Sequence, residues 1–230
     1  MPHDGREAAA RDNAEWCAVV CASHGLTGRS DADAWSVPRR SPPWYPDAVT
    51  LRPGVDPDAL LARIEEGPGA SVKDSFADLD LSGHGFVVLL DAQWIHRPPT
   101  HGPPGTPLTR VTTPERLAAW AGAHGGGELF RPELLTSPGV RILAREDERG
   151  GIVGGAVVSG EGVHGVSNVF TRTADPLDVW QGVLATLPGV PLVGYESGPD
   201  LAVALQAGFS PQGPLRVWLH PDPAPPPRRS

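Results

Sequence analysis

The sequence has little of several residue types on which many functions depend. Only one lysine, Lys73, occurs among the 19 basic residues of the 230-residue chain, and only two cysteines, two tyrosines and one methionine are present. The net charge is −8 at pH 7, and adjacent basic residues occur only at 39–40 and 228–229. Because nucleic-acid binders neutralise several phosphates with clustered Lys and Arg, this composition disfavours a nucleic-acid partner.

Long apolar runs are also missing. A membrane helix needs about 18 or more consecutive apolar residues, and the sequence has no such run. Its first residues, MPHDGREAAARDN, are polar and acidic, whereas a secretory signal is basic and then apolar. We therefore expect no membrane partner and a cytoplasmic location.

The two cysteines stand one helical turn apart. Cys17 and Cys21 at this spacing seldom reach disulfide geometry. His24 adds a third soft ligand, but no fourth ligand follows at a matching distance, so we expect no metal site. Two reduced thiols that pack as small apolar groups are the favoured interpretation.

Composition divides the chain into segments. Residues 1–11 and the tail 221–230, PDPAPPPRRS, carry almost nothing apolar and are predicted to be disordered. Residues 98–105 are predicted to be a linker because prolines and glycines there cannot continue regular structure. Two regions remain, 12–97 and 106–220.

The second region predicts an α/β fold with a mixed sheet. Residues 140–144, 152–158 and 163–170 are three apolar segments joined by short turns, which indicates an antiparallel meander. A helix capped by Asp175 and the buried strand PLVGYE (191–196) follow, so this strand should lie parallel in the sheet. A last helix ends at Gly208, and LRVWL (215–219) alternates as a final strand.

The first region predicts a smaller set of elements. A helix capped by Asn13, a strand over 48–51, a helix capped by Asp56 and a buried strand in FVVLLD follow one another. The same pattern occurs twice: a Gly-Phe pair is followed by a segment that ends with Trp and His, once at 85–96 and once at 208–220. This similarity is either a diverged tandem repeat or a coincidence.

At residues 106–220 the order of elements resembles the GNAT superfamily of acyl-CoA-dependent N-acyltransferases. The most specific piece is GPDLAVALQAGFSPQGPLRVWL, in which a helix ends in Ala-Gly-Phe before a short turn and a last strand. The resemblance implies a GNAT-like fold over 106–220 with an extra α/β region at 12–97. If the repeat is a diverged tandem, this region is a degenerate GNAT-like half.

The resemblance implies that two neighbouring strands separate and leave a slot for acetyl-CoA or another acyl-CoA. Strand-edge amides would pair with the extended pantetheine arm. The cofactor contacts then fall on Val169, Phe170, Thr171, Arg172 and Thr173.

This sequence departs from the family pattern at two points. The loop 171–176 lacks the glycines that let backbone amides reach a pyrophosphate, and Asp175 is instead placed to cap the helix. Arg172 could replace those amides as a bidentate phosphate donor. Ala204 stands where family members often have a tyrosine that protonates the leaving thiolate.

Catalytic candidates are few. Glu196 at the mouth of the slot and Glu161 in the meander turn are the candidates for a general base, because desolvation would raise the pKa of either carboxyl. Either could instead be a solvated surface acid. Asn168 would orient a substrate carbonyl or stabilise a bulge.

Two principal functions fit these features. The first is transfer of an acyl group, acetyl in the simplest case, from acyl-CoA to an amine of a small molecule or protein. The second is a catalytically inactive GNAT-like domain that binds a ligand or a protein. A donor such as aminoacyl-tRNA is disfavoured by the acidic charge.

Overall fold

One mixed sheet of eleven strands runs through the molecule. The computed structural model describes residues 5–99, 105–173 and 175–222. Along the sheet the strand order is β1-β2-β3-β4-β11-β5-β10-β9-β8-β7-β6. The predicted α/β mixed-sheet class is therefore confirmed. No helix in the described part of the chain is both long and apolar enough to cross a membrane.

The second region contains the predicted meander. Its elements are β6 (Thr109–Arg110), α3 (Pro114–His124), β7 (Arg141–Glu146), β8 (Ile152–Ser159), β9 (His164–Thr171), α4 (Pro176–Thr186), β10 (Leu192–Glu196), α5 (Gly198–Gln206) and β11 (Ser210–Leu219), with short 3-10 turns at Gly127–Leu129 and Pro132–Leu135. Strands β7, β8 and β9 pair antiparallel, and β10 joins β9 in parallel. Asp175 caps α4 through a hydrogen bond from the Leu177 N–H.

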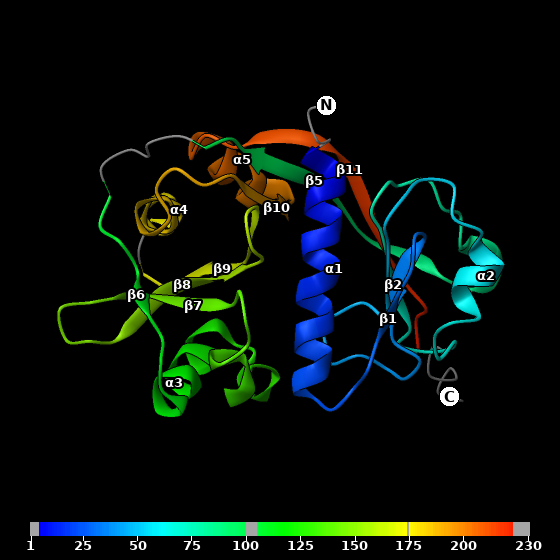
Figure 1. Ribbon diagram of the computed structural model, residues 1–230, viewed down its shortest axis with the longest axis horizontal. Coiled ribbons are helices and arrows are strands. Elements are labelled where there is room, and N and C mark those ends of the chain that lie inside the picture. The colour runs from blue at the N-terminus through cyan, green and yellow to red at the C-terminus, as the bar shows by residue number, and fades with distance from the viewer. Residues whose placement is uncertain (1–4, 100–104, 174, 223–230) are drawn as a thin grey trace, which may run out of the picture.

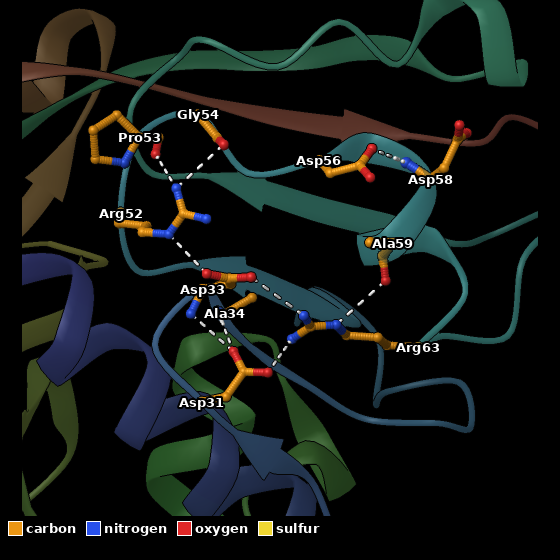
Figure 2. A network of polar contacts seen from close by, with 10 residues as sticks. All are labelled: Asp31, Asp33, Ala34, Arg52, Pro53, Gly54, Asp56, Asp58, Ala59 and Arg63. Carbon is orange, nitrogen blue, oxygen red and sulfur yellow. Dashed lines mark hydrogen bonds and ion pairs between the residues drawn. The ribbon is translucent and has the colours of Figure 1, made fainter.

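The first region supplies α1 (Gly5–Ser23), β1 (Arg29–Ser30), β2 (Ala34–Ser36), β3 (Ala48–Thr50), α2 (Pro57–Leu61), β4 (Ser71–Asp74), a 3-10 turn (Ser82–His84) and β5 (Val87–Arg97). Ion pairs link the turn between β1 and β2 to residues that follow β3 and α2 (Figure 2). Arg63 Nη1 lies 2.7 Å from Asp31 Oδ2, and Arg52 Nε lies 2.7 Å from Asp33 Oδ1. Exposed pairs of this kind each contribute about 0.2–1 kcal/mol, so they stabilise the hairpin only modestly.

The two regions repeat one topology and exchange their last strands. In each, a strand, a helix and a parallel strand are followed by a long final strand: β3, α2, β4 and β5 in the first, β9, α4, β10 and β11 in the second. Yet β5 pairs with β10, β11 pairs with β4, and the two final strands pair antiparallel with each other. Figure 1 shows β5 and β11 running together between the two halves. The sheet is therefore continuous across the two regions.

Two expectations about segment boundaries need correction. Residues 5–11, predicted to be disordered, belong to α1, so the helix does not begin at Asn13. Ala9 and Ala10 are buried against Trp94 and Val193 of the sheet, and alanine is the best helix former. The predicted linker 98–105 does not divide the sheet, because the exchanged strands join its two sides. Residues 1–4, 100–104 and 223–230, including most of the predicted tail, lie outside the described residues.

Helices cover the second half of the sheet on both faces. Side chains of α1 and α3 pack with Ile142 and Val157, whereas side chains of α4 and α5 pack with Leu143 and Val158. The alternation follows from the period of two along a strand. Figure 1 shows α1 standing between the two halves, so that it closes one side of the centre of the molecule.

Candidate functional site

Strands β9 and β10 separate after two residue pairs. Their parallel pairing consists of Leu192 with His164 and Val193 with Gly165. Beyond this point β10 continues along β5 to Glu196, and β9 continues along β8 to Thr171. We call the space between the diverging ends, residues 166–171 and 194–196, the wedge. The edges of β9 and β10 that face the wedge form no ladder with each other.

Gly194 stands where the two strands diverge. A Cβ built on this residue would lie 2.7 Å from the backbone oxygen of Val166, closer than any carbon can approach. Only glycine therefore allows the two backbones to meet at this point and then part.

A β-bulge shapes the other side of the wedge. The pairing of β8 with β9 passes from Val157–Ser167 to Gly155–Phe170, so one residue of β8 faces both Asn168 and Val169. Asn168 has φ +52°, a left-handed conformation that asparagine tolerates better than most residues. Its Nδ2 donates to Ser167 Oγ at 3.0 Å and lies 3.5 Å from the Tyr45 hydroxyl.

Two cavities meet at the wedge. The helix-side cavity, about 260 Å³, lies among β9, α4, β10 and α5, and is lined by Val169, Phe170, Thr171, Pro176, Val179, Trp180, Glu196, Asp200 and Val203. The inner cavity, about 290 Å³, is lined by Asn13, Trp16, Cys17, Trp44, Tyr45, Pro46, Lys73, His124, Ser167, Asn168, Val169, Tyr195 and Glu196. Val169 and Glu196 line both, so a group held between them could be reached from either cavity.

Glu196 is the ionisable group at this junction. Burial, reinforced by the nearby carboxylate of Asp200, raises the pKa of Glu196 to about 8. A carboxyl with this pKa exchanges protons near neutral pH, which suits a general base or acid. The other predicted base, Glu161, is exposed in the β8–β9 turn and lines neither cavity. The structure therefore brings only Glu196 to the wedge.

The predicted cofactor contacts divide into two groups. Val169, Phe170 and Thr171 line the helix-side cavity, whereas Arg172 and Thr173 are exposed and do not line it. The ring of Phe170 packs on α3, with its centroid 5.2 Å from those of Trp120 and His124.

The start of α4 is occupied by its own residues. Asp175 Oδ1 accepts the Leu177 N–H at 2.9 Å, and its backbone oxygen accepts the Asp178 N–H at 3.0 Å. Pro176 has no N–H to offer. The helix start therefore lacks the open amides that bind phosphate in other proteins. Ala204, which stands on α5 where the resemblance places the family's tyrosine, is buried in the core.

Much of the inner cavity comes from the first region, to which the sequence analysis assigned no catalytic or binding residue. Tyr45 of this region is buried, whereas its neighbour Trp44 is 70% exposed. Lys73 and the α1 residues Asn13 and Cys17 were missed. The one available signal was that Lys73 is the sole lysine of the chain.

The two cysteines are buried free thiols in the core. Burial raises the pKa of Cys17 to about 11 and that of Cys21 to about 12, so both thiols stay protonated near neutral pH. Among the described residues, no three His, Cys, Asp or Glu side chains are grouped to hold a metal ion.

Comparison with solved structures identifies the fold. The chain is similar to a GCN5-related N-acetyltransferase from Kribbella flavida, with TM-score 0.60 and 18% sequence identity over 94% of this chain and 96% of that chain. It is also similar to a putative GNAT-family acetyltransferase from Novosphingobium aromaticivorans, with TM-score 0.55 and 13% identity over 91% of this chain and 97% of that chain. No family model and no curated protein matches.

The chain has the fold of the GCN5-related N-acetyltransferases, in a diverged form. The similarity extends over nearly the whole chain, so it is not limited to residues 106–220 as the sequence indicated. It therefore includes the first region, in agreement with the repeated topology and exchanged strands.

Proposed function

We propose that this protein transfers an acyl group, acetyl in the simplest case, from an acyl-CoA to an amine of a small molecule or protein. The observation that carries the proposal is the wedge, in which two strands part and cavities on either side share Val169 and Glu196. The fold shared with N-acetyltransferases supports the same reaction class.

The proposed geometry assigns one substrate to each cavity. Over residues 166–170 the edge of β9 forms no ladder with β10, and in the helix-side cavity it offers backbone groups to the amides of an extended pantetheine arm. The thioester carbonyl then lies near Val169, where the inner cavity opens. The amine enters through the inner cavity, attacks the carbonyl carbon, and the carbon–sulfur bond breaks to release the thiolate.

Glu196 takes the proton that the amine loses. Most of the barrier is lowered by holding the amine and the carbonyl in line, and the base removes the proton as the new bond forms. Asn168, at the bulge, is proposed to orient the substrate carbonyl through its side-chain amide. Protonation of the leaving thiolate falls to water, because Ala204 cannot supply a proton.

The phosphates of an acyl-CoA fit less well than its pantetheine arm. Asp175 occupies the start of α4, so the nearby exposed Arg172 is proposed to clamp the pyrophosphate, with Thr173 beside it. The same occupied helix start, together with Ala204, favours the alternative function: a GNAT-like domain without catalysis that binds a ligand or a protein.

Thermal unfolding with acetyl-CoA separates the two functions. At a concentration 100 times the Kd, acetyl-CoA should stabilise the protein by about 2.7 kcal/mol. For a chain of this size that is a rise in Tm of roughly 5–10 °C. An unchanged Tm at millimolar acetyl-CoA contradicts the transferase and favours the binding module.

Arg172→Ala tests the clamp separately. It should reduce the rise in Tm, whereas Arg149→Ala, at an exposed arginine of the β7–β8 turn, should leave it intact. An unreduced response in Arg172→Ala refutes the clamp and not the transferase.

A further inference from the structure

Lys73 is buried at the inner cavity, and it forms no ion pair with the residues that the structure describes. It lies on β4, its residue is 3% exposed, and it lines the inner cavity. Its Nζ donates to Asn13 Oδ1 at 2.8 Å and lies 4.1 Å from the centroid of the Tyr195 ring. In the described ranges 5–99, 105–173 and 175–222, no carboxylate oxygen lies within 4.0 Å of this ammonium.

A buried ammonium with neutral partners is costly. Removing a charge from water carries a large penalty unless an opposite charge or several hydrogen bonds replace the lost hydration. An ammonium has three N–H donors, and Asn13 takes one. The ring of Tyr195 offsets part of the remainder. An anion bound in the cavity would supply the missing charge and accept the remaining hydrogen bonds.

Lys73 and Glu196 line the same cavity of about 290 Å³. We propose that the acceptor amine also carries a carboxylate, and that Lys73 binds this carboxylate while the amine lies at Glu196. This inference rests on the proposed transferase function and deepens it by naming the substrate class. Asn13 fixes the ammonium in place, and the ring of Tyr195, the residue before Glu196 on β10, contacts it.

A third space adjoins Lys73. This proline-lined cavity, about 660 Å³, shares Trp44, Tyr45, Pro46, Lys73 and Tyr195 with the inner cavity. Its remaining walls are mostly apolar and include Pro42, Pro43, Leu89, Leu90, Val217 and Leu219. An apolar group next to the carboxylate would fill it. The acceptor class is therefore an apolar amino acid or a similar amino carboxylate.

Matched pairs of amines test the carboxylate directly. With acetyl-CoA as donor, the pairs are L-phenylalanine with 2-phenylethylamine, and 6-aminohexanoate with hexylamine, which covers a longer spacing. We expect the wild type to prefer the carboxylate member of at least one pair by about 10- to 100-fold in kcat/KM, the range of a buried charge-assisted hydrogen bond.

Lys73→Met should abolish this preference, so that the ratio of kcat/KM between the two members of each pair falls to about one. Arg216→Met is the matched control, since it also removes a cation. Arg216 lies on the neighbouring strand β11, and its side chain lines neither the inner nor the proline-lined cavity. If Lys73→Met does not unfold cooperatively, Lys73→Gln takes its place, because it keeps a donor for Asn13 and drops the charge. The absence of any carboxylate preference in the wild type, or its persistence in the Lys73 variant, overturns the proposal.

Failure of the proposed transferase function can be told apart from failure of the Lys73 assignment. If none of the four amines is acetylated, the proposed function is contradicted, and binding then decides the anion site. N-acetyl-L-phenylalanine should raise the Tm of the wild type and not that of Lys73→Met, while N-acetyl-2-phenylethylamine should act equally on both. Equal stabilisation of both proteins by the carboxylate, or none, overturns the assignment to Lys73.

Discussion

The Glu196→Gln substitution should make the protein more stable at alkaline pH. Burial raises the pKa of Glu196 from 4.5 to about 8, so the folded chain prefers the neutral acid. The stability that this preference gives is full below pH 4.5 and is lost as the pH rises through about 8. At 1.36 kcal/mol per pKa unit the upper limit is about 5 kcal/mol. Water reaches part of the side chain, so we expect about 1–2 kcal/mol.

The assay is thermal unfolding of both proteins between pH 4 and pH 9. The glutamine variant should gain roughly 2–8 °C in Tm over the wild type at pH 9 and nothing at pH 4. Glu161→Gln is the control, because this acid is exposed and should not alter the pH dependence. If Glu196→Gln and the wild type lose stability in parallel as the pH rises, Glu196 is not desolvated and the case for it as the base fails.

Four further outcomes follow from the site. In the transfer assay, kcat/KM of the wild type should rise with pH to a plateau above about 8, and Glu196→Gln should lose about 10²–10⁴-fold; a variant with an unchanged profile excludes Glu196 as the base. Gly194→Val should abolish stabilisation by acetyl-CoA, because its Cβ meets the Val166 oxygen at 2.7 Å; a retained shift in Tm means that the strands tolerate a side chain at the fork. Asp175→Ala should cost about 1 kcal/mol by removing a cap, yet isothermal titration should show tighter acetyl-CoA binding, because it frees the Leu177 N–H; unchanged affinity means that the helix start takes no phosphate. Asp12 lies on α1, and its Oδ2 accepts the Ser159 hydroxyl at 3.0 Å. Burial raises the pKa of Asp12 from 3.8 to about 6, so the unfolding free energy of the wild type, measured in urea, should fall as the pH rises from about 4 to 6; an equal fall in Asp12→Asn would contradict that assignment.

The sequence predicted the local elements of the second region well because their signals are local. Asp175 and Pro176 mark the start of a helix, and alternating apolar residues mark the three meander strands. The sequence could place Glu196 at the wedge because this residue ends a buried strand that follows a crossover helix. Such signals depend only on residues within about one element of each other.

The exchange of β5 and β11 has no local signal. It joins Val87–Arg97 to Ser210–Leu219, more than one hundred residues away in the chain. The repeated Gly-Phe and Trp residues indicated a tandem but could not say which final strand completes which half. Because the sequence did not reveal that β5 and β11 are exchanged, the resemblance to the GNAT superfamily was assigned only to residues 106–220.

The inner cavity was missed for the same reason. It draws Asn13 from α1, Lys73 from β4 and Tyr195 from β10, which only the folded sheet brings together. The start of α1 was misjudged because Ala9 and Ala10 appear weakly apolar alone, yet small side chains let the helix lie close to Trp94.

Amide hydrogen exchange on the β9 edge tests the wedge most directly. Peptides that cover residues 166–170 should exchange more slowly when acetyl-CoA is added, because its pantetheine arm would pair with the edge of β9 that forms no ladder with β10. Peptides from β7, on the far side of β8, should be unaffected. Slowing confined to other segments, or no slowing on β9 under saturating acetyl-CoA, would contradict the assignment of the wedge to an acyl-CoA.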